Sequence, residues 1–511
     1  MHRPIQKTVT GGLALLLATS FSWVAASAST KPHVTGHARA SGALTVALTE
    51  PPASLDPLGP DSAAIPTLEI AQQVFDGLIR PGSKPGTYVP DLATSWTHPS
   101  ADVWSFKLRT DARFANGTRV TAHDVVASLK ALIAGKSPEA ALWTLYSNVT
   151  APNSHTVVIR TSSQMGTMLS AVALLSIVPA GEINNTSYWN KPFGSGPFKV
   201  ERFLPDESVT LVPNSHYWGT APKLRTLTMI DVPNESDLTA YLKTGKVDVA
   251  ISVPPDQVST LRGTRNLKIY TTPSYSEYWI WFNEGRSPFN NVLVRRAMWY
   301  ALPINSIVKS VWGKFATVST SPIASSVFGY AKQDPYPYDP AKAKQLLAQA
   351  GYPNGFSTSM MWEAAQAPYL QTMASLFVSA WAAVGINVTM DQQDPATWLS
   401  NLLALNWNMN MQEASDLTGD ADYIIGRLYM STSHRMGYDN PALDALLTDA
   451  RESVNPALRA KLYARADKLI WQQAVGIYPL NPFNIVAVRT NVHGFNPVPS
   501  TLDSFAGVSV G

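Results

Sequence analysis

The chain has 511 residues, more than one ordinary hydrophobic core accommodates, and this length predicts two or more domains. The charge is nearly balanced, with 39 Lys and Arg residues against 36 Asp and Glu residues. The sequence therefore shows no basic domain of the kind that binds nucleic acid. Cysteine is absent, which excludes disulfides, thiolate chemistry and cysteine-bearing metal sites.

The N-terminus has the pattern of a secretory signal. Residues 1–28 combine a basic start, an apolar run over residues 11–26 and a small-x-small cleavage site at Ala26-Ser27-Ala28. Residues 29–42 are then a flexible leader. A retained membrane anchor is the alternative, because the apolar run is close to the shortest length that spans a bilayer.

The first elements are predicted from local patterns. Residues 43–49 (ALTVALT) predict a strand that ends at Glu50. Residues 104–108 alternate apolar and polar side chains, as a half-buried strand does. Asn116-Gly117 predicts a tight turn with positive φ at both residues. Thr121, with an acidic residue three positions later at Asp124, predicts the N-cap of a helix.

A βαβ unit follows further along the chain. After a predicted strand region at residues 143–161, residues 224–232 predict a strand, residues 236–244 a helix and residues 247–253 another strand. Such a succession implies a parallel pair of strands.

In the second half, helices share one start signal, an Asp or Asn cap residue followed by proline at the first helical position. The cap residues are Asp339, Asp394, Asn440 and Asn455. Between these starts, strand and helix patterns alternate, which predicts an open and mostly parallel sheet. The predicted order is strand 356–362, helix 368–384, strand 386–390, helix 395–405, strand 408–412 and helix 457–473.

Two stretches carry a resemblance to a known family. The stretch from Tyr88 to Lys130 contains PDLATSW, WSFKLR, RFANGTRVTAHDVV, and Tyr338 to Tyr352 reads YDPAKAKQLLAQAGY. Both closely resemble the signature of the extracellular solute-binding proteins of family 5. These are the peptide-, nickel- and oligosaccharide-binding receptors of ABC importers.

The resemblance implies an α/β, two-lobed periplasmic-binding-protein fold of mixed, mostly parallel sheets flanked by helices. Lobe I would comprise residues 43–272 plus 480–511, with an inserted subdomain at about residues 74–190. Lobe II would comprise residues 273–479. A hinge between the lobes would lie at the two crossings, near Thr272-Pro273 and Tyr478-Pro479. Many relatives are tethered by a lipid-modified cysteine, which this chain lacks, so we expect a periplasmic or extracellular protein.

Ligands of open α/β sheets bind outside the carboxyl ends of the strands, and this rule selects candidate residues. If the two lobes line one cleft, the ligand meets acidic groups and aromatic walls, which favours cationic or amine-bearing ligands. The candidates are Glu50, Pro51 and Ala53 in lobe I, and Trp362, Glu363, Glu413, Ser415 and Asp416 in lobe II.

The resemblance also selects Asp416. In peptide-binding members an aspartate at this position holds the ammonium of the peptide, and the alternative is a capping role in its own loop. Asp420 and Asp422 are expected to cap or to face solvent. Dipeptide-binding members carry an arginine before a Pro-Tyr pair; here Tyr369 belongs to such a pair, but Ala367 precedes it, so that carboxylate clamp is absent.

Other ligands remain open. Trp362, and less so Trp279 and Trp281, would stack on sugar rings if the ligand is an oligosaccharide, although strand aromatics more often fill a core. Nickel has weaker support, since the histidines are scattered and none cluster in the strand-end loops; His434 is the one candidate, although a lone histidine is usually structural. In a different class, Glu363 and Glu413 beside Trp362 would be the acid and base of a secreted glycoside hydrolase.

The function predicted from these observations is an extracytoplasmic receptor of an ABC importer. It would bind peptides in the interlobe cleft by hinge closure and deliver them to the membrane permease subunits. We expect a monomer that is not an enzyme, with no metal, no other cofactor and no nucleic-acid partner.

Overall fold

The computed structural model describes residues 42–511 except Thr49 and residues 365–367. The side chains of residues 235, 236, 368 and 369 also lie outside the description. The predicted signal peptide and nearly all of the predicted leader fall outside the described residues. Within them, no helix is long and apolar enough to cross a membrane.

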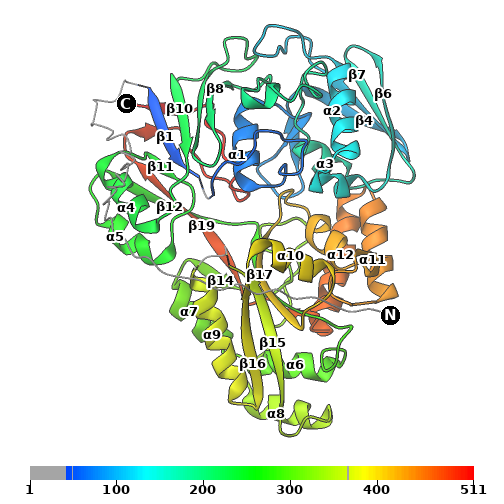
Figure 1. The fold of residues 1–511 in the computed structure, drawn as a ribbon. Coiled ribbons are helices and arrows are strands. Elements are labelled where there is room, and N and C mark those ends of the chain that lie inside the picture. Colours follow the sequence, from blue (N-terminus) through cyan, green and yellow to red (C-terminus); the bar gives the residue numbers. More distant parts are fainter. Residues whose placement is uncertain (1–41, 49, 365–367) are drawn as a thin grey trace, which may run out of the picture. The chain divides into compact units, whose positions relative to one another are not determined.

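The first lobe is built on a sheet of eight strands, and its central three run parallel. The strand order is β12-β19-β11-β1-β10-β9-β8, with β14 paired to β19. Strands β10 and β11 are parallel to β1, which lies between them (Figure 1). The βαβ prediction is confirmed for β10, α4 and β11, but the two strands are not neighbours. The elements are β1 (Ala43–Ala47), β8 (Phe198–Leu204), β9 (Ser208–Pro213), β10 (Thr226–Ile230), α4 (Glu235–Thr244), β11 (Val249–Ala250), η3 (Pro255–Gln257), α5 (Val258–Arg262), β12 (Leu267–Pro273), β14 (Ala316–Val318) and β19 (Leu480–Arg489).

A second, antiparallel sheet of the first lobe has the order β4-β5-β7-β6. The predicted helix start is confirmed, because Thr121 N donates to Asp124 Oδ2 at 2.8 Å in a capping box. The turn prediction is half wrong, since Gly117 has a φ of +87° but Asn116 is not in the positive-φ region. The elements are α1 (Ile65–Val74), β2 (Ile79–Pro81), β3 (Tyr88–Pro90), β4 (Ala93–Ser100), β5 (Val103–Leu108), α2 (Ala122–Ala134), η1 (Pro138–Trp143), β6 (Tyr146–Asn153), β7 (Thr156–Thr161), α3 (Met168–Leu174) and η2 (Tyr188–Asn190), with a late hairpin of β20 (Val492–His493) and β21 (Ser509–Val510).

The second lobe is built on a sheet of five strands in the order β16-β15-β17-β13-β18. Strand β15 is parallel to both β16 and β17, which confirms the predicted parallel succession. Strand β13 is antiparallel to β17 and β18, so the sheet is mixed. The strands are β13 (Ser276–Phe282), β15 (Phe356–Glu363), β16 (Ile386–Gln393), β17 (Met409–Ser415) and β18 (Gly476–Ile477).

The helices of the second lobe begin where the sequence predicts. Asp339 and Asp394 accept hydrogen bonds from the backbone N–H three residues later, and Asn440 and Asn455 accept from two successive N–H groups. Proline follows each cap, so four of these starts are confirmed. The helices are α6 (Val292–Tyr300), α7 (Ile304–Trp312), α8 (Pro340–Gln349), α9 (Pro368–Ala382), α10 (Pro395–Leu403), η4 (Asp422–Gly426), η5 (Ser431–Ser433), α11 (Pro441–Glu452) and α12 (Pro456–Gln472).

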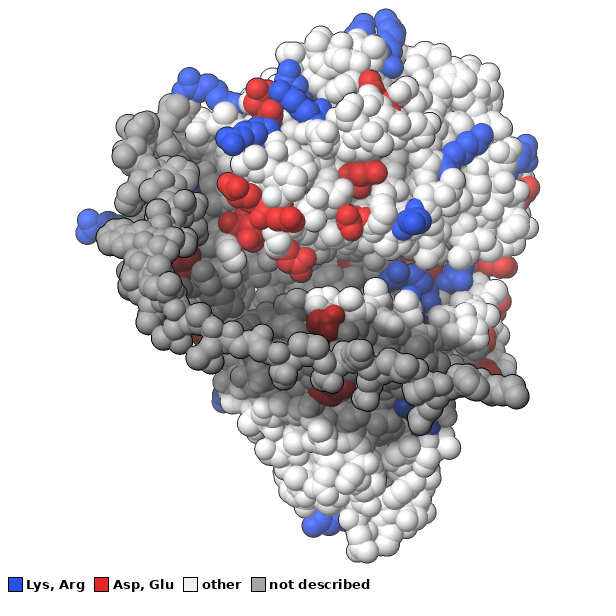
Figure 2. Space-filling model, viewed as in Figure 1, with Lys and Arg blue, Asp and Glu red and all other residues white. Residues whose placement is uncertain are grey.

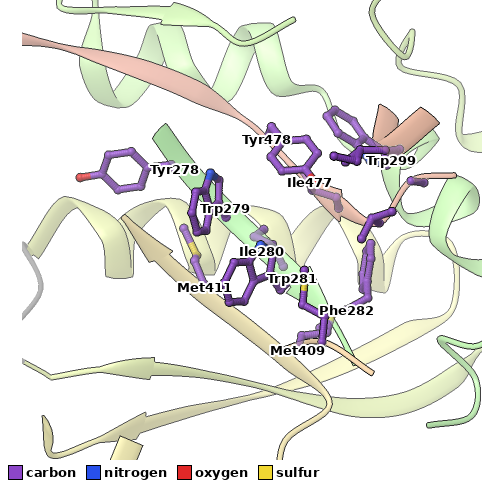
Figure 3. Close-up of a cluster of buried hydrophobic side chains, with 14 of the residues drawn as sticks. Tyr278, Trp279, Ile280, Trp281, Phe282, Trp299, Met409, Met411, Ile477 and Tyr478 are labelled. Carbon is purple, nitrogen blue, oxygen red and sulfur yellow. The ribbon is translucent and has the colours of Figure 1, made fainter. Parts of the chain in front are cut away.

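The aromatic strand β13 forms the centre of the second lobe's core. Trp279 and Trp281 are 0% and 1% exposed, and their rings stack with centroids 4.8 Å apart (Figure 3). Trp281 Nε1 donates to Tyr429 Oη at 3.0 Å, which satisfies a buried donor. The two tryptophans therefore fill the core, as Trp381 and Trp471 also do in agreement with the prediction.

The two lobes are joined by chain crossings and by direct contacts. The chain leaves the first sheet after β12 and returns through β19, close to the predicted crossings, while the exact domain boundaries stay predictions. Ser163 Oγ of the first lobe donates to Glu452 Oε1 at 2.9 Å. Gly166 N donates to Arg451 O at 2.7 Å, so the lobes touch each other in this structure.

Candidate functional site

Asp416 lies directly after β17 in a tight loop that its own carboxylate organises. Its Oδ1 accepts hydrogen bonds from Thr418 N at 2.8 Å, Thr418 Oγ1 at 2.9 Å and Gly419 N at 2.7 Å. Gly419 has a φ of +66°, and a Cβ there would lie 2.8 Å from the Tyr275 ring, so glycine is required. One oxygen of Asp416 thus has the capping role that the sequence left open.

The other oxygen of Asp416 has no hydrogen-bond partner in the described structure. The residue is 1% exposed, and its Oδ2 is fully buried. Burial raises the pKa of Asp416 to about 7, with repulsion from Asp420 adding to the shift and the bonds from Thr418 opposing it. A buried acceptor without a donor is costly, so Oδ2 is suited to receive a donor from a ligand.

The nearby cations are already paired with other carboxylates. Arg459 contacts Asp420 through two 2.8 Å hydrogen bonds, and Arg451 Nε lies 3.1 Å from Asp422 Oδ2. Asp420 is 1% and Asp422 9% exposed. The prediction that these two aspartates face solvent is therefore wrong, because both are buried in ion pairs. Its alternative, a capping role, is confirmed for Asp420, whose Oδ1 accepts from Asp422 N at 3.1 Å. Sequence patterns did not reveal partners so distant along the chain.

Three tyrosines from different segments surround Asp416. The charge of Asp416 contributes, after burial, to the raised pKa of Tyr275 and to that of Tyr423, which rises to about 12. Tyr88, on β3 of the first lobe, has its pKa raised by burial first and then by Asp420 and Asp416. A contact between the lobes lies next to this loop: a Cβ on Gly86 of the first lobe would be 2.6 Å from the Phe328 ring, and Phe328 N donates to Gly419 O at 2.9 Å.

The predicted strand-end acids of the two lobes also come together. Loss of hydration raises the pKa of Glu50, and repulsion from Glu363 adds to it. Loss of hydration likewise raises the pKa of half-buried Glu413, with Glu50 contributing, while Tyr278 Oη donates to Glu413 Oε2 at 2.8 Å. Glu50 is therefore coupled electrostatically to acids of the second lobe. Figure 2 shows a group of acidic side chains on the upper part of the displayed face, which belongs to the first lobe.

The remaining predicted site residues are buried in the core, exposed at the surface or outside the described part of the chain. Trp362 is 3% exposed within the second lobe's core, which corresponds to the core alternative rather than to a stacking platform. Pro51 and Ala53 are exposed, and exposed Ser415 shares a 2.6 Å hydrogen bond with Ser276. The side chain of Tyr369 lies outside the described part of the chain, as does Ala367.

Two acidic residues were missed by the sequence reasoning. Glu69, on α1, and Asp503, near the C-terminus, are 1% and 2% exposed, and both carry carboxylate oxygens without partners. A glutamate inside the apolar run IPTLEIAQQV was the available signal for Glu69. Nothing in the local sequence distinguishes Asp503.

Metal ligands do not cluster among the described residues. No group of three or more His, Cys, Asp or Glu side chains there is arranged to hold a metal ion. His434, the histidine singled out in the sequence, follows η5 with a φ of +50° and belongs to no such group.

Comparisons with known proteins show the family and the fold. Residues 87–434 match the family described as bacterial extracellular solute-binding proteins, family 5 Middle. The chain is 28% identical over 435 residues to glutathione-binding protein GsiB of Escherichia coli (strain K12), covering 81% of this chain and 84% of that protein. It is 29% identical over 329 residues to heme-binding protein A of Haemophilus influenzae, covering 63% and 60%. The structure of the periplasmic binding protein DppA from Helicobacter pylori, in complex with peptide STSA, is similar with a TM-score of 0.79 at 24% identity over 92% and 98% of the two chains.

Proposed function

Because the chain belongs to the bacterial extracellular solute-binding proteins of family 5, the receptors of ABC importers, we propose that its solute is a peptide held through its terminal ammonium by Asp416. Peptide binding by a protein of the same fold, DppA with its bound peptide, supports this choice. We also propose that the chain is secreted through its signal peptide and acts in the periplasm or outside the cell.

The unpartnered Oδ2 of Asp416 is the observation that carries the proposal. Three donors hold Oδ1 in place, so Oδ2 is pre-oriented and needs no rearrangement before a ligand binds. An ammonium group has three donors and a full positive charge, and its hydrogen bond to a carboxylate contributes about 1.5–3 kcal/mol net. Burial strengthens this interaction, because water does not screen it.

Closure of the lobes would complete the site. Gly86 of the first lobe lies against the ring of Phe328, whose N donates to Gly419 O at 2.9 Å in the Asp416 loop, so the first lobe would cover a ligand bound at Oδ2. The ligand stabilises the closed form by the difference between its binding free energies for the closed and the open forms. The crossings after β12 and before β19 would serve as the hinge between lobe I (43–272 plus 480–511) and lobe II (273–479), and the closed form would be the one that the permease recognises.

Other solutes have less support from the geometry. An oligosaccharide would need exposed aromatic faces, but Trp279, Trp281 and Trp362 lie in the core. A secreted glycoside hydrolase would need turnover, whereas the named relatives are binding proteins. Recovery of the ligand unchanged after incubation distinguishes a receptor from that enzyme.

The decisive test compares free and N-acetylated forms of one peptide. A thermal-shift screen of di- to pentapeptides selects the ligand, since binding to the folded state raises its melting temperature. Calorimetry then measures wild type and Asp416→Asn. We expect that acetylation and the substitution each weaken binding by roughly 2–5 kcal/mol, and that combining them adds little because both remove the same interaction.

A matched control is Asp391→Asn, which changes an exposed carboxylate of the same lobe and should leave the affinity unchanged. An affinity that is the same in wild type and Asp416→Asn would remove Asp416 from the site. Equal binding of the free and acetylated peptides would rule out recognition of the ammonium.

A further inference from the structure

Glu69 is a buried carboxyl group to which the described protein offers no hydrogen bond. It is 1% exposed, and neither Oε1 nor Oε2 has a partner. The amide of Gln73, one helical turn further along α1, is committed elsewhere: Nε2 donates to the backbone oxygens of Glu69 and Asp503, and Oε1 accepts from Phe505 N. Glu69 is thus held in place by its helix while its side chain remains unsatisfied.

Asp503 brings a third unpaired oxygen to the same place. Gln73 Nε2 donates to Asp503 O at 2.7 Å, which fixes this C-terminal segment against α1. Asp503 Oδ1 accepts from Val498 N at 2.8 Å, whereas Oδ2 is buried without a partner. The charge of Asp503 acts on Glu69 and raises its pKa further, so the two carboxyl groups are neighbours.

The pair adjoins the cleft through Glu50. Glu50 also raises the pKa of Glu69, and the same Glu50 is influenced by Glu363 and influences Glu413 of the second lobe. Glu50 is thus coupled electrostatically both to Glu69 and to acids of the second lobe. The C-terminal segment that carries Asp503 also lies beside the Asp416 loop, because Tyr275 N donates to Pro499 O at 3.1 Å and Asp416 N donates to Tyr275 O at 3.2 Å.

Unpartnered oxygens also occur on other deeply buried acids, such as Glu139 Oε1 and Glu284 Oε1, but Glu69 is the acid in the described part of the chain whose two oxygens are both buried and unpartnered. Glu277, 2% exposed, accepts hydrogen bonds from Ser319 and Asn481. Glu284 forms a 2.8 Å ion pair with Arg295. A purely structural Glu69 would be expected to have such a partner, because an unsatisfied buried carboxyl group is costly. Three unpaired oxygens on two neighbouring acids are what a bound cation would satisfy.

We propose that Glu69 and Asp503, with Glu50 at the entrance, form a second cation subsite, and that the preferred ligand is a peptide with a lysine or arginine side chain. This inference rests on the proposed function, in which Asp416 holds the terminal ammonium. The side-chain ammonium or guanidinium would donate to the free oxygens of Glu69 and to Asp503 Oδ2. The ligand would then carry two positive charges that meet carboxylates on both lobes.

The test uses two peptides that differ only in one charge. Tripeptides with lysine at each position in turn are compared, by calorimetry on the full chain, with the same peptides carrying norleucine, which keeps the stem and removes the ammonium. We expect the best lysine peptide to bind at least about tenfold more tightly than its norleucine counterpart, which corresponds to one charge-assisted hydrogen bond. Glu69→Gln and Asp503→Asn should each reduce this ratio toward one while changing norleucine-peptide affinity less than about twofold.

The remaining arms separate this inference from the proposed function. Asp416→Asn should weaken the binding of both peptides alike and keep the ratio of their affinities. Glu207→Gln, which changes an exposed acid of the first lobe, should change neither affinity. Equal binding of the lysine and norleucine peptides to wild type, or a ratio that survives both Glu69→Gln and Asp503→Asn, overturns the subsite and leaves the proposed function intact. Failure of every peptide to bind overturns both.

Discussion

Arg459 and Asp420 form a bidentate ion pair, in which each of two guanidinium nitrogens donates to a different carboxylate oxygen at 2.8 Å. Both side chains are buried, and Asp420 is four residues beyond Asp416. The pair commits this buried guanidinium to Asp420. Asp416 Oδ2 consequently stays free for a ligand, although a buried arginine is close by.

Removal of Arg459 should destabilise the protein strongly. Arg459→Met leaves the buried Asp420 without its partner, and loss of one member of such a pair costs about 3–5 kcal/mol of unfolding free energy. Urea unfolding measures the change. Arg465→Met on the exposed side of the same helix is the control, with an expected effect within about 0.5 kcal/mol. A loss as small as that of the control would show that the pair is not needed for stability.

Peptide affinity should have an optimum near neutral pH. The pKa of Asp416 is raised to about 7 in the free protein, so below pH 7 a proton must leave the carboxyl group before the ammonium binds. Affinity should fall about tenfold per pH unit below 7, and it should fall again above about pH 8 as the terminal amine loses its proton.

Calorimetry between pH 5 and pH 9 tests this dependence. Asp416→Asn should bind weakly at every pH and lack the fall on the acidic side. An acidic fall that persists in this variant would assign the titration to another group.

Replacement of Glu69 should stabilise the ligand-free protein. Its pKa is raised well above the ordinary value by burial first and then by Asp503 and Glu50, so at neutral pH the native state carries the cost of an unpaired buried acid. Glu69→Leu removes that cost, and we expect a gain of about 1–3 kcal/mol in urea unfolding.

The gain should depend on pH in a definite direction. A raised native pKa means that the native state binds a proton more tightly than the unfolded chain does. Stability is then lost as pH rises above the unfolded value of about 4.3 toward the native pKa. The benefit of Glu69→Leu should therefore grow from pH 4 to pH 7, and a variant less stable than wild type at pH 7 would contradict it.

The loop that holds Asp416 should not tolerate a side chain at Gly419. Its φ of +66° and the 2.8 Å approach to the Tyr275 ring mean that Gly419→Ala strains the backbone and displaces Tyr275. We expect a loss of about 1–3 kcal/mol in stability together with weaker peptide binding. Gly181→Ala is the matched control, because nothing lies within 4 Å of its added Cβ.

The sequence by itself determined the features that depend on near neighbours. The capping box of Thr121 and Asp124, the four cap-proline helix starts and the alternating strand β5 all follow from residues a few positions apart. The strand-end rule also selected Asp416 and Glu50, because the order of strands and helices fixes which loops meet at a sheet edge.

Only the tertiary structure decided which of the candidate side chains are paired, buried or free. Trp362 lies near the carboxyl end of β15 as predicted, but its side chain is in the core, and Asp420 is paired with an arginine 39 residues away. Gln73 donates to the backbone of Asp503 and so holds it near Glu69, although Gln73 and Asp503 are 430 residues apart in the chain. Whether a side chain is hydrated or paired depends on groups that come together only in the folded protein, and the local sequence does not specify those groups.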